Sequence, residues 1–169
     1  MAEEIGQDPK TVIERYLDGV RLVEEALSGL SGASLDEVPD TENWSIRQIV
    51  HHLADGDDIW SLAVKMALGG GEALFDLHWY WQTTQEQWGR NWAYAQREIR
   101  PALELLAANR RYIIDLVEAL PGAWECSVKV PWPHREASLL TVGQILAMQT
   151  RHICGHIEDI RKIRQIRGI

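Results

Sequence analysis

The sequence has little of several features that mark common protein classes. Its 169 residues include only two cysteines, Cys126 and Cys154, and these form no CxxC pair of the kind that binds zinc. No apolar run reaches the roughly eighteen residues that a membrane-spanning helix needs. The N-terminal stretch MAEEIGQDPK is acidic and lacks the apolar core of a secretory signal. We therefore expect a cytoplasmic protein with no membrane association and no structural disulfide.

Positive charge is also scarce. The chain carries 17 Lys and Arg residues against 25 Asp and Glu residues, for a formal net charge of -8 at pH 7. Such a charge repels a phosphate backbone, so nucleic-acid binding would need a local basic patch. The dense basic stretch RKIRQIRG, at Arg161–Gly168, lies near the end of a predicted helix, where cations interact favourably with the helix dipole. We expect no nucleic-acid partner.

Apolar residues recur with the spacing of amphipathic helices in four segments. Asp8 and Pro9 suit the start of the first helix, and Ser45 with Gln48 forms a capping-box pattern at the start of the second. Glycine clusters are expected to end both helices. The predicted helices run from Pro9 to the Gly29–Gly32 cluster, from Ser45 to Gly69–Gly71, over about Ala95–Leu120 with a start or kink at Pro101, and from near Thr141 to about Arg167.

The segments between these helices show no convincing strand pattern. Residues 121–140 are expected to form an irregular or briefly extended crossover. No internal repeat or low-complexity segment is evident. The sequence therefore predicts an all-α fold, an up-and-down or crossover four-helix bundle in which residues 1–169 form one domain.

The aromatic residues are skewed toward tryptophan, with eight Trp against one Phe. Four of them (Trp79, Trp81, Trp88 and Trp92) lie in the connection between the second and third predicted helices, at residues 75–92. This segment is too long for an ordinary connection, so we expect a functional loop or a short helix packed on the bundle. Its tryptophans could roof a pocket, or they could serve a dimer contact or the core, and the sequence favours neither.

Two histidines, His152 and His156, lie one turn apart in the last predicted helix, whose other inward positions are apolar. Residues four apart are neighbours on a helix surface, so the two rings can converge on one point, as a metal site requires. Gln149 lies one turn earlier on the same stripe, and Asp159 follows three residues after His156 and could orient its ring. The HExxH pattern of metalloproteases is excluded because Ile153 follows the first histidine.

The second predicted helix offers a third ligand. His52 lies at the flank of its apolar face, whereas His51 turns outward and is expected to be a solvated surface residue. Asp57 falls near the middle of that face, either because the helix turns to solvent there or because a carboxylate is buried beside the site. Cys154 projects away from the two histidines of the last helix and is expected to be a small buried residue, not a ligand.

Two motifs together resemble the DinB/YfiT-like superfamily: WSIRQIVHHLAD at Trp44–Asp55 and HICGHIEDI at His152–Ile160. The resemblance extends over nearly the whole chain, because helix order and spacing also match. It implies a four-helix bundle, often a homodimer, with a divalent metal, commonly nickel or zinc, held by three histidines. Transferred by motif position, these are His52, His152 and His156. Asp159 stands where many relatives carry Gln, and Gly155 where many carry another histidine.

The resemblance implies several functions. Characterised relatives include metal-dependent transferases that use low-molecular-weight thiols, and a thiol-dependent isomerase; others are described as metal-dependent hydrolases. The favoured hypothesis is a thiol-dependent transferase acting on a small electrophilic substrate. A metal-dependent hydrolase on the same site and a non-enzymatic metal or small-molecule binding module are the alternatives. A requirement for added thiol separates the two enzymes, and metal-dependent turnover separates both from the third.

Overall fold

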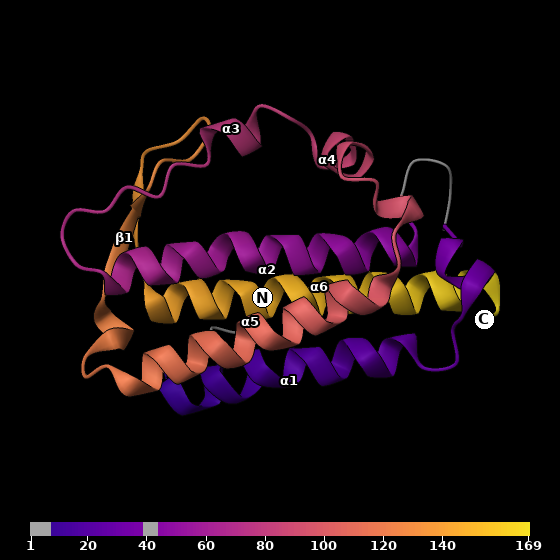
Figure 1. The fold of residues 1–169 in the computed structure, drawn as a ribbon, viewed down its shortest axis with the longest axis horizontal. Helices are drawn as coiled ribbons and strands as arrows, with labels where there is room; N and C mark the ends of the chain where they lie inside the picture. The colour runs from indigo at the N-terminus through magenta and orange to yellow at the C-terminus, as the bar shows by residue number, and fades with distance from the viewer. Residues whose placement is uncertain (1–7, 39–43) are drawn as a thin grey trace.

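Four long helices form a bundle in the structure, a computed structural model that describes residues 8–38 and 44–169. They are α1 (Pro9–Leu27), α2 (Ile46–Leu68), α5 (Ile99–Ala119) and α6 (Val142–Arg167) (Figure 1). The main packing pairs are α2 with α5, α1 with α6, α2 with α6 and α1 with α5. Helices α1 and α2 follow each other in the sequence but lie diagonally across the bundle. The topology is therefore the crossover alternative.

The predicted helix ends agree closely with the structure. The Asp8 carboxylate accepts a hydrogen bond from the Thr11 backbone N–H at the start of α1. Capping boxes pair Ser45 with Gln48 at the start of α2, and Thr141 with Gln144 at the start of α6. Helix α5 begins at Ile99 and not near Ala95, which puts Pro101 in its first turn. There the missing backbone N–H costs no helical hydrogen bond.

A short β-hairpin connects α5 to α6, after a 3-10 turn η3 (Ala123–Glu125). Strand β1 (Ser127–Val130) pairs antiparallel with β2 (Ser138–Thr141), with Ser127 opposite Thr141. The prediction of a briefly extended crossover between the third and fourth helices is thus confirmed. The prediction that this segment contains no strand was wrong. Four residues per strand are too few for the alternation of buried and exposed positions to stand out.

The whole Trp-rich connection between α2 and α5 covers residues 69–98, which include the 75–92 segment. It contains α3 (His78–Trp81), α4 (Gln85–Asn91) and the 3-10 turn η2 (Tyr94–Gln96). It runs along α2 on the side away from α1 and α5 (Figure 1). Its beginning is attached to the hairpin, because Leu74 forms a parallel bridge with Lys129. The Trp88 indole N–H donates to the backbone oxygen of Tyr80 at 2.8 Å, and the two rings stack. The connection is therefore made of short helices packed on the bundle.

The buried apolar side chains form two clusters along the bundle. Toward the hairpin, one cluster includes Ala63 of α2, Ile113 of α5 and Leu146 of α6. Toward the other end, the second includes Leu53, Leu106 and Ile153 of the same three helices. The positions between them hold polar side chains, so polar chemistry is concentrated at mid-bundle.

The basic stretch at the end of α6 contacts the end of α1 and the loop that follows. Arg164 donates to the backbone oxygens of Ala26 and Ser28, at 2.7 and 3.0 Å, and Arg167 donates to that of Val38 at 2.7 Å. These cations therefore satisfy carbonyls left free at a helix end and in a loop. Among the described helices, none combines the length and apolar character needed to cross a membrane.

Candidate metal centre

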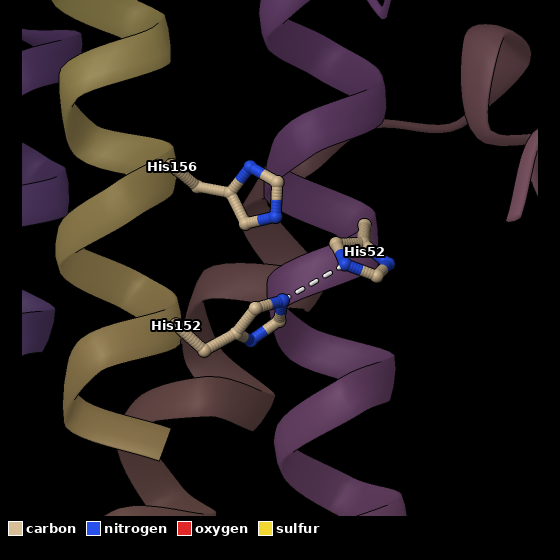
Figure 2. A group of neighbouring side chains, drawn as sticks. All are labelled: His52, His152 and His156. Carbon is tan, nitrogen blue, oxygen red and sulfur yellow. Dashed lines mark hydrogen bonds between the residues drawn. The ribbon is translucent and has the colours of Figure 1, made fainter. Parts of the chain in front are cut away.

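Three histidine rings from two helices converge at mid-bundle. His52 comes from α2, and His152 and His156 come from α6 (Figure 2). One ring nitrogen from each lies within 4.8 Å of the others, and the Nε2 atoms of His52 and His152 are 3.0 Å apart. Two nitrogens that bind one tetrahedral zinc at about 2.0–2.1 Å lie roughly 3.3 Å apart. The distance between His52 and His152 is close to what a shared ion requires, and the third nitrogen, from His156, lies within 4.8 Å of both.

Burial keeps these rings neutral. Burial, together with repulsion from the charged forms of the His152 and His156 rings, lowers the pKa of His52 to about 2. Burial, together with repulsion from His156 and Arg110, lowers the pKa of His152 to about 4. Burial also lowers the pKa of His156, although Asp159 opposes the shift. Near pH 7 all three rings therefore offer lone pairs, as metal ligands must.

Two neighbours hold the rings in place. The indole of Trp44 packs edge-on against His52, with ring centroids 4.6 Å apart, and stacks on His156 at 6.4 Å. The Nδ1 of His156 lies 3.0 Å from Oδ2 of Asp159. When Nδ1–H donates to this carboxylate, Nε2 is left with its lone pair. Asp159 can therefore fix both the orientation and the tautomer of His156.

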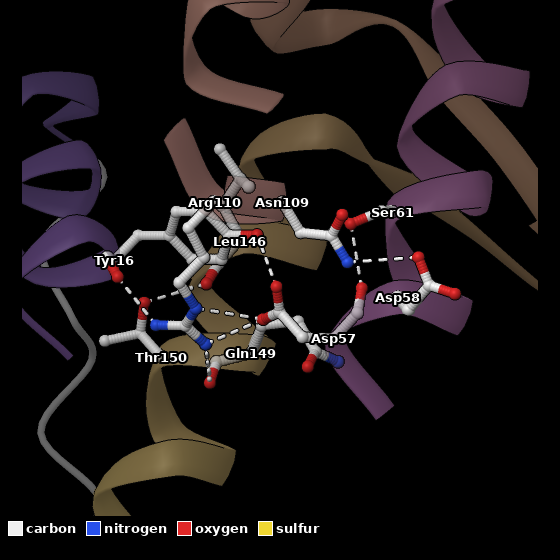
Figure 3. Close-up of polar contacts among 9 residues, drawn as sticks. All are labelled: Tyr16, Asp57, Asp58, Ser61, Asn109, Arg110, Leu146, Gln149 and Thr150. Carbon is white, nitrogen blue, oxygen red and sulfur yellow. Dashed lines mark hydrogen bonds and ion pairs between the residues drawn. The ribbon is translucent and has the colours of Figure 1, made fainter. Parts of the chain in front are cut away.

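Asp57 is buried, but its partner is a cation that the sequence analysis did not identify. Its Oδ1 accepts from Nε and Nη2 of Arg110, at 2.9 and 2.8 Å (Figure 3). Arg110 also donates to the backbone oxygens of Tyr16 and Gln149. Burial raises the pKa of Asp57, and the guanidinium opposes that shift. The contacts of Asp57 therefore lie within this pair and with Tyr16, and none of them is to a histidine ring.

A glycine makes room for this arginine. A Cβ atom at Gly19 of α1 would lie 2.6 Å from Nη1 of Arg110, closer than two such atoms can approach. The sequence carried a signal for Arg110: it falls between Leu106 and Ile113 on the apolar face of α5, just as Asp57 falls on that of α2. Opposite charges on two apolar faces indicate a buried pair.

A cavity of about 370 Å³ opens beside His52 and His152. Its walls include Trp60 of α2, Trp81 of α3 and Trp132 of the loop between β1 and β2, together with Gln149 of α6. Of the tryptophans in the 75–92 connection, Trp81 thus lines the pocket, whereas Trp79 and Trp92 border a separate groove. Trp60 and Trp132 were not predicted as pocket residues. Trp60 had a signal, because it lies eight residues after His52 on α2, in an i, i+4, i+8 row through Gly56. Trp132 had none, because it lies in a loop far from the histidines in the sequence.

Two expectations about residues next to the ligand candidates were wrong. His51 is only 1% exposed; its ring stacks on Tyr94, and its Nε2 lies 3.3 Å from the backbone oxygen of Arg97. The Trp-rich connection covers this side of α2, which a helical projection cannot show. Cys154 is exposed because it shares the solvent-facing stripe of α6 with Arg151 and Glu158. Both cysteines are free.

Known proteins resemble this chain in sequence and in fold. A protein of Oceanobacillus iheyensis named "Putative metal-dependent hydrolase" is 22% identical over 165 residues, covering 93% of this chain and 90% of that protein. The structure of YfiT from Bacillus subtilis, described as "a probable metal-dependent hydrolase with an unusual four-helix bundle topology", superposes with a TM-score of 0.82 at 17% identity. It covers 99% of this chain and 92% of YfiT, a likeness that shows the shared fold.

A match to a family model identifies the protein family of this chain, which neither similar protein does alone. The model described as the DinB superfamily matches residues 17–160, which include all three clustered histidines. The family that the two sequence motifs indicated is therefore confirmed. This protein belongs to the DinB superfamily.

Proposed function

We propose that this protein is a metal-dependent hydrolase of a small-molecule substrate, with a divalent ion held by His52, His152 and His156. The observation that carries the proposal is the convergence of three ring nitrogens, from two helices, within 4.8 Å. The lowered pKa values of the rings support it, because neutral imidazole is the form that binds metal. The descriptions of YfiT and of the Oceanobacillus protein as metal-dependent hydrolases agree with it.

The donor set fits a metal of borderline softness. Three imidazole nitrogens suit zinc or nickel, whereas magnesium and calcium prefer oxygen ligands. Three protein ligands also leave a coordination position open, as in catalytic zinc sites. A divalent ion held in this way polarises a carbonyl group and lowers the pKa of water that it binds.

The residues around the site have separate tasks. Asp159 holds His156 through Nδ1, and Trp44 packs on His156 and on His52. Trp60, Trp81 and Trp132 form apolar walls of the cavity that His52 and His152 also line. A substrate that displaced water from these walls would strengthen the electrostatic interactions made inside the site.

We propose hydrolysis in place of thiol transfer, the reaction that the family resemblance had favoured. Both similar proteins are described as hydrolases. Use of a low-molecular-weight thiol, the choice between nickel and zinc, and a homodimeric assembly stay predictions.

Metal analysis of the purified protein tests the ligand assignment. We expect about one zinc or nickel ion per chain, and loss of stoichiometric binding in His156→Ala, because two histidines retain metal far more weakly than three. His78→Ala is the matched control, since His78 is exposed and hydrogen-bonded to Gln82 outside the cluster. Full metal occupancy in His156→Ala would contradict the assignment.

A substrate panel tests the reaction class with the metal-loaded protein. Neutral esters and amides are offered with and without added thiols, and the products are identified by mass spectrometry. Hydrolysis without thiol supports the proposal. Turnover only with thiol, and a thioether product, would show a transferase. Bound metal with no turnover of any substrate would point to the binding module.

A further inference from the structure

The cavity beside the histidines is lined by three tryptophans, and we call it the tryptophan pocket. Its walls include Trp60, Trp81, Trp132 and Gln149, next to His52 and His152. The rings of Trp81 and Trp132 stack, with centroids 5.5 Å apart and planes 23° apart. The ring of Trp60 lies 5.8 Å from that of Trp132. Three separate chain segments thus bring flat apolar faces to one place.

Formal charge is missing from this pocket. Among the described residues that line it, none is Asp, Glu, Lys or Arg; the polar side chains are His52, His152, Gln149, Gln85 and the Tyr80 hydroxyl, besides the indole N–H groups. The neighbouring groove differs, because Asp55, Asp58 and Arg97 line it. Arg135 packs its guanidinium on the ring of Trp132, 4.1 Å from the ring centroid, but it is exposed and does not line the cavity. In the metal-free protein, a charged group entering the tryptophan pocket would therefore lose its hydration without gaining a buried opposite charge. The pocket therefore favours a neutral ligand.

Gln149 supplies a hydrogen-bonding group that the protein itself does not use. Its side chain is 4% exposed, and its Oε1 has no hydrogen-bond partner among the described residues. Rotation about the last side-chain bond exchanges the oxygen and the nitrogen of the carboxamide, so either a donor or an acceptor can be presented. A buried polar group in this state is stabilised by a polar ligand atom.

We propose that the tryptophan pocket binds the neutral aromatic part of the substrate, which makes the substrate class the neutral esters and amides of aromatic acids. The ring packs among Trp60, Trp81 and Trp132, and Gln149 hydrogen-bonds to a polar group beside it. The reaction named here depends on the proposed function, but binding in the pocket does not.

Hydrolysis of such a substrate also changes its affinity for the pocket. The acyl C–O or C–N bond breaks, and water supplies the new C–O bond. The alcohol or amine that leaves carries away one proton of the water, and the aromatic acid then ionises near pH 7. The product is thus an anion, whereas the substrate is neutral. The lining of the tryptophan pocket contains no cationic side chain, so without a bound metal the pocket favours the neutral substrate over the anionic product.

Cinnamamide and cinnamate test this difference, because they share a flat skeleton and differ in charge. We expect cinnamamide to bind at least about tenfold more tightly by isothermal titration calorimetry, with the protein freed of metal by a chelator so that no ion attracts the carboxylate. Equal affinity, or tighter binding of cinnamate, would overturn the proposal.

Variants locate the binding. Trp81→Ala should weaken cinnamamide about tenfold, because it removes one wall of the pocket. Trp79→Ala is the matched control: Trp79 belongs to the same short helix but borders the other groove, so binding should stay within about twofold. Circular dichroism verifies the fold, and Trp132→Phe replaces Trp81→Ala if that variant unfolds. Equal effects of the Trp79 and Trp81 variants would also overturn the proposal.

The outcomes distinguish this inference from the proposed function. If the protein binds cinnamamide as described but holds no metal, the pocket assignment stands and the hydrolase proposal fails. If it holds metal and hydrolyses esters but binds both probes equally, the hydrolase proposal stands and the pocket assignment fails.

Discussion

Two polar clusters share α2: His52 belongs to one, and Asp57, five residues later, belongs to the other. They are built in opposite ways, because His52 meets two histidines of α6 (Figure 2), whereas Asp57 meets Arg110 of α5 (Figure 3). Asp57 and Arg110 carry opposite charges, and their side chains are 1% and 2% exposed. The histidine cluster brings together three groups of the same kind, and its carboxylate, Asp159, lies at an exposed edge.

The difference bears on which cluster would gain a partner from a ligand. Each charge of the Asp57–Arg110 pair is offset within the protein, and Arg110 makes further hydrogen bonds to backbone oxygens. The imidazoles have lone pairs that converge, and a cation is the partner that would satisfy all three at once. We infer that the ion pair is complete within the protein, whereas the histidines serve binding.

The largest expected effect comes from breaking the ion pair. Arg110→Met leaves the Asp57 carboxylate buried without its cation, and we expect it to lower the free energy of unfolding by about 3–5 kcal/mol. Urea denaturation of both proteins measures this change. A loss below about 1 kcal/mol would show that the Asp57 carboxylate does not depend on Arg110 to offset its buried charge.

The double variant Asp57→Leu/Arg110→Met is the control for that experiment. It removes both charges, so we expect at least half of the lost stability to return. We also expect metal stoichiometry to be unchanged, because neither side chain hydrogen-bonds to a ring of the histidine cluster. Loss of metal from the folded double variant would mean that the two clusters are not separable.

An intermediate effect is expected from pH. The pKa of His152 is lowered to about 4 in the folded chain, from an ordinary value of 6.5. The unfolded chain therefore binds the proton first, and stability that is fully present above about pH 6.5 is lost as pH falls toward 4. For His152 alone, we expect a loss of about 2 kcal/mol between pH 7 and pH 5 in the metal-free protein, measured by urea denaturation.

His152→Leu sharpens the same measurement. This variant removes the group that the unfolded chain would protonate, so its stability should depend less on pH over that range. An unchanged pH dependence would show that His152 is not held neutral by its surroundings.

The smallest expected effect comes from the edge of the histidine cluster. Asp159→Asn keeps an acceptor for Nδ1 of His156 but removes the charge, and we expect metal affinity to fall by about tenfold. Competition with a chromophoric chelator measures it. Glu158→Gln is the matched control, because Glu158 pairs with Arg161 on the exposed side of α6 and should leave metal affinity unchanged.

Local signals made most of the helical fold predictable. Asp8, Ser45 and Thr141 cap helices through their own side chains, and these contacts depend on residues only three positions away. The i, i+4 spacing of His152 and His156, with His52 at the flank of an apolar face, likewise indicated which rings would meet. Short strands and the start of α5 were missed or shifted because their signals span only a few residues.

The sequence by itself therefore determined most of the helix ends, the apolar faces of the helices, and which three histidine rings come together. Only the tertiary structure decided that α1 and α2 lie diagonally, that the Trp-rich connection buries His51, that Arg110 reaches Asp57, and that Trp60, Trp81 and Trp132 share one pocket. The physical reason is range. Caps and helical periodicity act between residues within one or two turns, whereas these contacts join segments whose meeting depends on how the whole bundle packs.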